Sequence, residues 1–348
     1  MTLEDLGWSA HFQGQVTTEE WPTVLPARVV RVRRGELWLR AVDFETTVTP
    51  ASVAQNVGGD EDHPTLGDWL LLDIQTRQPI RRLERKSLLK RKAPGTARAV
   101  QLIAANVDVL FIVSSCNQDF NLERLERYLA LAGEAGAMPV VVLTKADLCD
   151  DPALYVAQAV SLAPGLVVEC IDARDPKSSA PLVAWCGPGQ TVALLGSSGT
   201  GKSTLTNTLR GSNEQRTGPI REDDSKGRHT TSERVLLPLA DNGWLADTPG
   251  IRELQLHDVA NGISLAFADV EELATGCTFR DCSHGSEPGC DVIAAVAAGT
   301  LPARRVESFR KLYAEEARNH ETFAQRRNRE RIFSKMVRDV DKTHGKRR

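Results

Sequence analysis

One stretch of the sequence carries the residue types that bind a nucleoside triphosphate. It reads Gly-Ser-Ser-Gly-Thr-Gly-Lys-Ser-Thr and has the G-x-x-x-x-G-K-S spacing of a phosphate-binding loop, or P-loop. Its glycines let backbone N–H groups close around phosphates, Lys202 adds a point charge, and the Ser203 hydroxyl can bind Mg²⁺. The predicted phosphate-binding residues are Gly196, Ser197, Ser198, Gly199, Thr200, Gly201, Lys202, Ser203 and Thr204.

A second group of residues has the spacing of a metal site. Three thiols and one imidazole lie close together in the sequence: Cys277, Cys282, His284 and Cys290. They form a complete tetrahedral set for Zn²⁺ with no position for water, so the predicted site is structural. The surrounding residues, 259–299, include few large apolar side chains, so a metal would hold this region together. Unligated thiols grouped this densely are the less favoured alternative.

Two further motifs fit a guanine nucleotide. Asp-Thr-Pro-Gly at 247–250 has the D-x-x-G pattern, in which Asp247 would contact Mg²⁺ through water and the Gly250 N–H would contact the γ-phosphate. Thr-Lys-Ala-Asp at 144–147 is similar to the guanine-reading pattern N-K-x-D. Asp147 would accept hydrogen bonds from guanine N1–H and the 2-amino group, which adenine cannot supply.

Alternating β and α patterns place these motifs. We expect strands at 107–113, 139–143, 166–170, 191–195, 233–239 and 244–246, and helices at 122–133, 153–161 and 203–209. The alternation predicts a doubly wound parallel α/β sheet, whose ligands bind beyond the carboxyl ends of the strands. The P-loop lies between a strand and a helix. The helix N-terminus would therefore face the anion, which favours a bound phosphate over a glycine turn without a ligand.

The N-terminal part has a different pattern. Short β-type runs between residues 26 and 92 predict a small β-barrel, of which the oligonucleotide-binding (OB) barrel is a common type. From Arg77 to Lys92 there are eight Lys and Arg residues and one acid, Glu84. This basic run favours nucleic-acid binding over a role in protein contact alone. Trp38 and Trp69 could stack on bases, but a place in the core is the better prediction for each.

Composition indicates the class of protein. The 348 residues suffice for two or three domains, and 41% hydrophobic with 26% charged residues is typical of a soluble globular protein. No apolar run approaches the roughly 20 residues that span a bilayer. The acidic N-terminus argues against a signal peptide, and the seven cysteines do not resemble a secreted disulfide framework. A cytoplasmic protein is therefore predicted.

The C-terminal end is basic, although the whole chain has a net charge of −3. Residues 304–348 hold 15 Lys and Arg and 7 Asp and Glu, a net charge of +8. A helix is expected from 303 to about 339, and the runs 326–329 and 346–348 would contact RNA phosphates. A solvated charged helix is the alternative.

The motifs stand in an unusual order. The guanine-reading loop precedes the P-loop and D-x-x-G comes last, as in a GTPase sheet that was opened after D-x-x-G and joined through 172–189. With these motifs in this order, the chain resembles the RsgA (YjeQ/EngC) family of circularly permuted, ribosome-dependent GTPases over nearly its whole length. The D-x-x-G switch would then lead directly into the C-terminal part and could reposition it.

The resemblance implies an activity and partners. It implies a Mg²⁺-dependent GTP hydrolase that is slow until the small ribosomal subunit stimulates it. Such a protein binds the subunit and its rRNA, assists late maturation and is released through hydrolysis. GTP or GDP, one structural Zn²⁺, a monomeric state and no membrane are expected.

The resemblance also implies roles for two further segments. Gly-Arg-His-Thr-Thr at 227–231 looks like the family's switch I, where either Thr230 or Thr231 would bind Mg²⁺ together with Ser203 and Asp247. Asp172 and Ala173 stand where the family has its Ser-Ala guanine-supporting loop, beside the guanine-binding Thr144, Lys145 and Asp147.

The sequence departs from the family pattern in two places. Thr144 replaces the usual Asn and Asp172 replaces the common Ser, so weaker guanine contact and weaker bracing of the loop are expected. In addition, Ile251 occupies the place of the water-orienting Gln of Ras-like GTPases, which predicts slow intrinsic hydrolysis. His229 is the nearest catalytic candidate, and the alternative is an exposed histidine on a flexible loop.

These observations predict four consecutive parts. They are a poorly ordered lead-in at 1–25, an OB-like RNA-binding barrel at 26–95, a circularly permuted GTPase domain at 96–255, and a zinc-binding helical domain with a basic tail at 256–348. Two other functions stay open on the residues alone: an RNA-binding module whose nucleotide is a slow structural ligand, and a P-loop ATPase or kinase.

Overall fold

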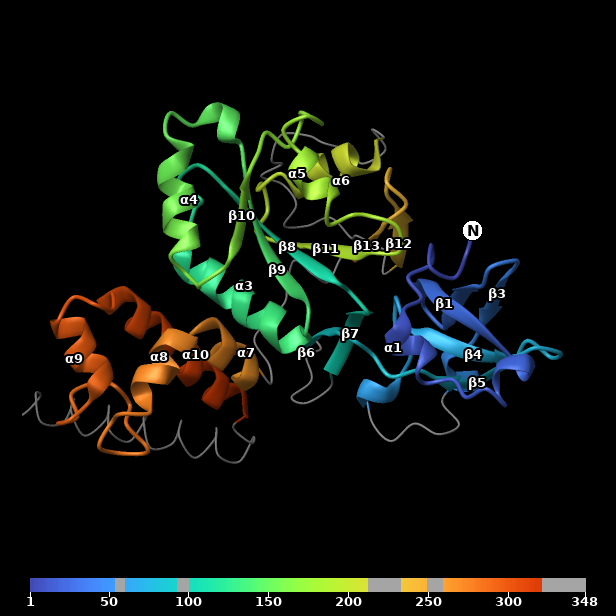
Figure 1. The fold of residues 1–348 in the computed structure, drawn as a ribbon, viewed down its shortest axis with the longest axis horizontal. Helices are drawn as coiled ribbons and strands as arrows, with labels where there is room; N and C mark the ends of the chain where they lie inside the picture. Colours follow the sequence, from blue (N-terminus) through green and yellow to red (C-terminus); the bar gives the residue numbers. More distant parts are fainter. Residues whose placement is uncertain (54–59, 93–99, 212–232, 249–258, 321–348) are drawn as a thin grey trace, which may run out of the picture.

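The computed structural model describes residues 1–53, 60–92, 100–211, 233–248 and 259–320. Three parts follow one another along the chain (Figure 1): a small β unit, a central α/β unit and a C-terminal helical unit. The β unit and the helical unit lie on different sides of the central one. The predicted multidomain architecture is confirmed.

The β unit has the strand order of an OB barrel. Its strands pair in the order β3-β2-β1-β4-β5, and every pair is antiparallel. Side chains alternate between the core and the surface, as in β2, where Leu37 and Leu39 are buried and Trp38 between them is half-buried. The elements are β1 (Val24–Arg33), β2 (Glu36–Arg40), β3 (Glu45–Val48), α2 (Pro50–Val53), η3 (Asp60–Asp62), β4 (Trp69–Asp73) and β5 (Pro79–Arg82).

Residues 1–25 are packed against this unit, so the expectation of a poorly ordered lead-in was wrong. They include the short helices α1 (Ala10–Gln13) and η1 (Trp21–Thr23). Phe12 is fully buried, and Trp8 packs edge-on against Trp69 with ring centroids 4.9 Å apart. Burial of these large rings offsets the entropy cost of ordering the segment. Trp69 is a core residue, as predicted.

The central unit is a sheet covered on both faces by helices (Figure 1). Its strands lie in the order β10-β9-β8-β11-β13-β12. In β8, Leu110 and Ile112 belong to the apolar cluster that includes α3, whereas Phe111 and Val113 belong to the cluster that includes α6. This alternation explains the continuous apolar runs in the sequence. The strands are β8 (Val109–Ser115), β9 (Met138–Thr144), β10 (Val167–Cys170), β11 (Thr191–Leu195), β12 (Arg234–Pro238) and β13 (Trp244–Asp247); the helices are α3 (Leu122–Ala135), η4 (Ala146–Leu148), α4 (Pro152–Val160), α5 (Ala180–Val183) and α6 (Lys202–Arg210).

One strand departs from the predicted parallel sheet. β12 runs antiparallel to β13, because the few residues between them form a tight turn rather than a crossover. β12 also pairs with β1, with Arg31 opposite Val235, so the sheet continues from the central unit into the β unit. A separate pair of strands, β6 (Leu88–Lys92) and β7 (Val100–Ala105), lies between the two units.

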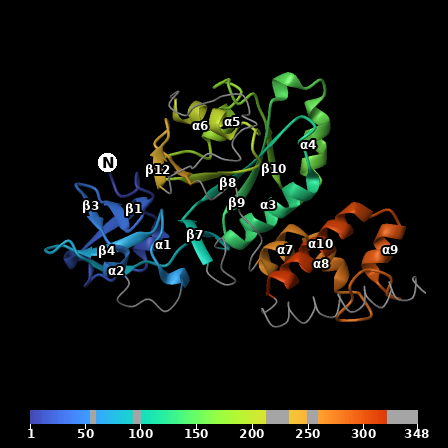
Figure 2. The same ribbon diagram turned by 180° about the vertical axis from the view of Figure 1, so that it is seen from behind.

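The helical unit is attached to the central unit through α3, beside which it lies in both views (Figure 1, Figure 2). Glu126 of α3 is fully buried and accepts hydrogen bonds from Arg304 and Arg305, each at 3.0 Å. A side chain at Gly262 would place its Cβ 1.9 Å from the carbonyl oxygen of Ala130, so only glycine allows this close approach. The helices are α7 (Ala260–Ala266), α8 (Ala268–Ala274), α9 (Asp291–Ala297) and α10 (Ala303–His320). The predicted helix beyond residue 320 lies outside the described residues.

Candidate functional site

The P-loop curls around the ammonium group of Lys202. The Lys202 Nζ donates to the carbonyl oxygen of Gly196 at 2.7 Å and also to that of Ser197. Gly196 lies against β8, where a Cβ would be 2.2 Å from the carbonyl oxygen of Val113. Gly201 has φ +89° and caps the start of α6. The sequence pattern therefore reflects a loop that requires glycine both for close packing and for a left-handed backbone.

Three of the predicted motifs meet at one edge of the sheet. β11 pairs with β13, with Ala193 opposite Ala246, so Asp247 ends its strand next to the P-loop. On the other side, β8 separates β11 from β9, and Ser115 pairs with Thr144 at the end of β9. This is the edge at which ligands of doubly wound sheets bind. The candidates Gly250, His229, Thr230 and Thr231 lie outside the described residues.

Thr144 braces the P-loop although it replaces the family's asparagine. It is fully buried, and its hydroxyl lies 2.7 Å from the carbonyl oxygen of Thr200 and 3.1 Å from that of Ser114. A hydroxyl carries one proton and can donate to only one of these oxygens at a time, whereas an amide has two donors. A direct contact between the predicted guanine-reading loop and the P-loop is therefore present, and threonine supplies one donor fewer than asparagine would.

We expect Thr144→Val to lower the affinity for GDP about 5- to 30-fold. Valine has a similar shape, but it leaves the buried carbonyl of Thr200 without its donor, which costs about 1–2 kcal/mol. The measurement is a fluorescence titration with a labelled GDP. Thr47→Val, on exposed strand β3, is the matched control. Equal GDP affinity of Thr144→Val and the unaltered protein would show that the contact does not support the loop.

Asp147, the predicted guanine-reading aspartate, has a neighbour that sequence reasoning missed. Asp147 lies in η4, and the Arg174 Nη2 donates to its Oδ2 at 2.6 Å. The same guanidinium contacts Asp172, through Nε at 3.2 Å, and this hydrogen bond lowers the pKa of the Asp172 carboxyl. The predicted loop Asp172–Ala173 thus lies beside Asp147, and the only signal for Arg174 was its place directly after that loop.

A second missed residue links the P-loop to α3. The Arg124 guanidinium contacts the hydroxyl of Ser197 and, at 3.0 Å, the carboxylate of Asp119. The next turn of α3 carries Arg127, which pairs with Glu315 of α10 at 2.6 Å. One helix therefore touches both the P-loop and the helical unit. In the sequence, these arginines are indistinguishable from solvent-facing charges on an amphipathic helix.

The four predicted metal ligands converge. Their ligand atoms all lie within 4.8 Å of one another. Cys277 Sγ is 3.7 Å from Cys290 Sγ and 3.7 Å from His284 Nδ1, and His284 Nδ1 is 3.4 Å from Cys290 Sγ. Bonds of tetrahedral zinc imply edges of about 3.8 Å between two sulfurs and about 3.6 Å between sulfur and nitrogen. The residues present therefore fit such an ion.

The loop around this candidate metal site is held by its own hydrogen bonds. Glu287 accepts from the backbone N–H groups of Ser283 at 2.9 Å and Gly285 at 2.8 Å, as well as from the Ser283 hydroxyl. These bonds, above all that of the Ser283 hydroxyl, hold the pKa of Glu287 well below its usual range. His284 has φ +53° and packs against Phe309, with centroids 6.0 Å apart. The ligand atoms are thus positioned by the folded chain.

Comparison with known proteins identifies the family. A family model described as RsgA GTPase matches residues 82–257. The chain is 49% identical to a protein of Vibrio parahaemolyticus serotype O3:K6 (strain RIMD 2210633) named Small ribosomal subunit biogenesis GTPase RsgA 2, over 97% of this chain and 92% of that one. The chain belongs to the RsgA GTPase family. GTP hydrolysis is the activity of this family.

Further relatives agree with this membership. A protein of Mesorhizobium japonicum (strain LMG 29417 / CECT 9101 / MAFF 303099) named Small ribosomal subunit biogenesis GTPase RsgA is 49% identical over 91% of each chain. The fold is similar to that of YjeQ from Thermotoga maritima, with a TM-score of 0.61, 22% identity and coverage of 84% of this chain and 98% of that one. It is also similar to that of YloQ, described as a circularly permuted GTPase, with a TM-score of 0.61, 20% identity and coverage of 86% and 97%. A circularly permuted GTPase fold explains why the segment 144–147 precedes the P-loop in this chain.

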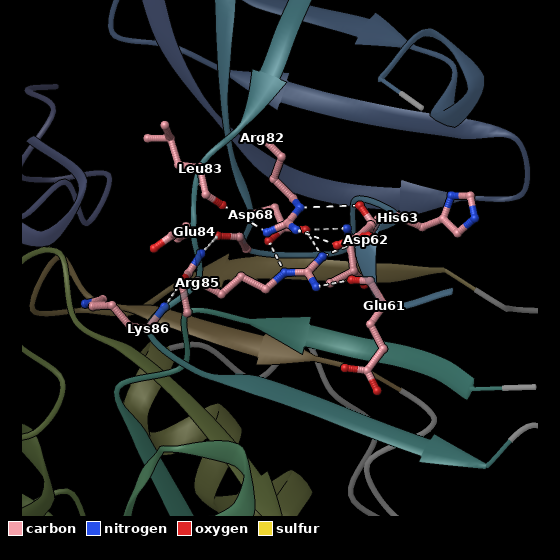
Figure 3. Close-up of polar contacts among 12 residues, drawn as sticks. Glu61, Asp62, His63, Asp68, Arg82, Leu83, Glu84, Arg85 and Lys86 are labelled. Carbon is pink, nitrogen blue, oxygen red and sulfur yellow. Dashed lines mark hydrogen bonds and ion pairs between the residues drawn. The ribbon is translucent and has the colours of Figure 1, made fainter. Parts of the chain in front are cut away.

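Several cations of the basic run at 77–92 form ion pairs within the fold, some of which Figure 3 shows. Arg85 forms a bidentate ion pair with the buried Asp68, in which Nε donates to Oδ1 and Nη2 donates to Oδ2, each at 2.7 Å. Its Nη2 also donates to the carbonyl oxygen of His63 at 2.7 Å. Other cations of the run pair with acids elsewhere in the fold: Arg81 with Glu20, Arg82 with Asp62, Lys86 with Asp108 and Lys90 with Glu61. Their number in the sequence therefore overstates the positive charge that is free for RNA.

Proposed function

We propose that this chain is a Mg²⁺-dependent GTPase that binds the small ribosomal subunit and its rRNA, assists late maturation, and is released when GTP is hydrolysed. The observation that supports this best is the meeting of the P-loop, Asp247 and Asp147 at one sheet edge in the permuted order. The relatives at 41–49% identity that are named small ribosomal subunit biogenesis GTPases support the target.

The P-loop would hold the phosphates of GTP. In this proposal the backbone N–H groups of 196–204 bind the phosphate oxygens, and Lys202 exchanges its carbonyl partners for the outer phosphates. Ser203, Asp247 and one of Thr230 and Thr231 would hold Mg²⁺, which neutralises charge that develops on the phosphate oxygens. Gly250 would contact the γ-phosphate.

Guanine recognition would depend on Asp147, with Thr144 and Lys145 on the same loop and Asp172 and Ala173 on the supporting loop. A carboxylate accepts from both N1–H and the 2-amino group of guanine, and adenine presents an acceptor where guanine has N1–H. GTP is therefore preferred over ATP. Hydrolysis by the isolated protein is slow because Ile251 cannot orient water, and His229 is the candidate to supply a polar group on the subunit.

The remaining parts would contact the subunit. At the tip of the β1–β2 hairpin, Arg33 and Arg34 are exposed, and OB barrels bind oligonucleotides with this loop. The basic tail would contact rRNA phosphates. We assign one structural Zn²⁺ to Cys277, Cys282, His284 and Cys290. We also propose that the protein is monomeric and cytoplasmic. Within the described part of the chain, no helix has the length and apolar character needed to cross a membrane.

Asp147→Asn tests the nucleotide assignment. We expect GTP turnover to fall at least about tenfold, because asparagine offers a donor where guanine also has a donor, the 2-amino group. Turnover of xanthosine triphosphate, whose 2-oxo group accepts that donor, should rise. Both are measured as phosphate release. ATP turnover by the unaltered protein that exceeds its GTP turnover would contradict the assignment and favour an ATPase or kinase.

A further inference from the structure

Arg174 lies between two carboxylates at the base-reading end of the nucleotide site. Its Nη2 is 2.6 Å from Oδ2 of Asp147 and 3.3 Å from Oδ2 of Asp172, and its Nε is 3.2 Å from Oδ1 of Asp172. The carboxyl of Asp147 is mostly shielded, with 25% of its side chain exposed, whereas 65% of the Arg174 side chain is exposed. The arginine therefore covers Asp147 from the solvent side.

The backbone that carries Arg174 is fixed at several points. Its own N–H donates to Asp172 Oδ1 at 2.9 Å, and the N–H of Asp172 donates to the Ser178 hydroxyl at 2.9 Å. The carbonyl oxygen of Ala173 accepts from Thr208 of α6 at 2.6 Å. The guanidinium thus extends toward Asp147 from a loop that is tied to the helix following the P-loop.

A guanidinium and a guanine present the same chemistry to a carboxylate. Guanine offers N1–H and the 2-amino group as neighbouring donors, and arginine offers a fork of N–H donors with a full positive charge. The guanine base and the Arg174 guanidinium cannot both donate hydrogen bonds to the same carboxylate oxygens of Asp147 at the same time. A guanine that binds there must displace Arg174, at least in part.

We propose that Arg174 competes with guanine for Asp147 and thereby sets the affinity and exchange rate of guanine nucleotides. Asp172, which stands where the family commonly has serine, can still pair with the arginine after guanine displaces it from Asp147. This inference rests on the proposed function, because it needs guanine at Asp147. Adenine offers no donor pair that could replace the arginine, so the competition lowers the affinity for guanine nucleotides and leaves the affinity for ATP unchanged.

The test compares Arg174→Ala with the unaltered full chain in titrations with fluorescently labelled GDP. Exposed ion pairs change equilibrium constants by about 1.5- to 5-fold, so GDP should bind about 1.5- to 5-fold more tightly to the variant and associate faster. The difference should shrink as salt is raised to about 1 M, where the screening length is about 3 Å. Affinity for ATP should not rise.

Lys177→Ala is the matched control, because it removes an exposed cation from the same loop. The Lys177 side chain contacts neither Asp147 nor Asp172. It should leave GDP affinity as in the unaltered protein. Equal or weaker GDP binding by Arg174→Ala, with normal binding by the unaltered protein, would overturn the competition and leave the GTPase assignment intact. Absence of GDP binding to both proteins would instead overturn the GTPase assignment itself.

Discussion

Lys202→Ala is expected to reduce GTP turnover at least about 100-fold, because removal of one group that stabilises transition-state charge commonly costs 10²- to 10³-fold. The Lys202 ammonium is already held at the centre of the P-loop by the carbonyl oxygens of Gly196 and Ser197. It is therefore positioned before any phosphate arrives, and no other lysine in the described residues lies in this loop.

Phosphate release at saturating GTP, with and without small ribosomal subunits, measures this effect. The control is Lys177→Ala, which removes a lysine of the same unit outside the P-loop. It should keep normal turnover. If Lys202→Ala hydrolysed GTP within about threefold of the unaltered rate, the loop would not be the phosphate site.

Cys290→Ser is expected to cause loss of the bound metal and unfolding of the helical unit. Apparent binding energies of structural zinc in small peptides reach about 10–16 kcal/mol, which is as large as the total stability of many domains, about 5–15 kcal/mol. Cys290 is buried and its Sγ lies 3.4 Å from His284 Nδ1, so serine removes one of the four candidate ligand atoms from a buried position.

Metal content by native mass spectrometry and helix content by circular dichroism test this second prediction. Cys149→Ser, which changes a half-buried cysteine of the central unit, should retain both the metal and the helices. The central unit should keep GDP binding in Cys290→Ser, because α3 belongs to its own core. Purified unaltered protein without any bound zinc would contradict the assignment of the metal.

The local elements were largely predictable from sequence because the strands are short apolar runs bounded by glycine, proline and polar residues. The strand β11 (Thr191–Leu195) has the predicted limits, and α3 (Leu122–Ala135) begins at the predicted residue. Its N-cap, Asn121, accepts from the N–H of Arg124 at 2.9 Å, and Gly136 with φ +71° ends it. These signals lie next to the helix in the sequence, and the limits of a helix are therefore largely a local property.

Tertiary pairing was not predictable in the same way. In the sequence, the eight cations of 77–92 have the character of an RNA-binding surface. In the fold, acids from other parts of the sequence pair with several of them, as Asp68 does with Arg85 and Asp108 with Lys86. The order of residues 1–25 depends on Trp69, which lies in another strand. Arg124 and Arg174 could be recognised as neighbours of the predicted nucleotide site only from the fold, which brings them against Ser197 and Asp147.

The predicted site residues also divide into those that a local motif reveals and those that depend on tertiary contacts. Lys202, Thr144 and the candidate metal ligands were predicted from motif spacing, because phosphate and metal geometry fix which residue types can stand at which positions. The brace from Thr144 to Thr200 was expected to be weak, and the structure shows the contact at 2.7 Å because the threonine side chain already reaches the neighbouring loop.

The most direct test of the central proposal is GTP turnover by the purified protein in the absence and presence of purified small ribosomal subunits. The proposal predicts slow hydrolysis of GTP alone and stimulation of many-fold by the subunit, with little ATP hydrolysis in either case. GTP turnover that does not change when small subunits are added in excess would contradict a ribosome-dependent GTPase.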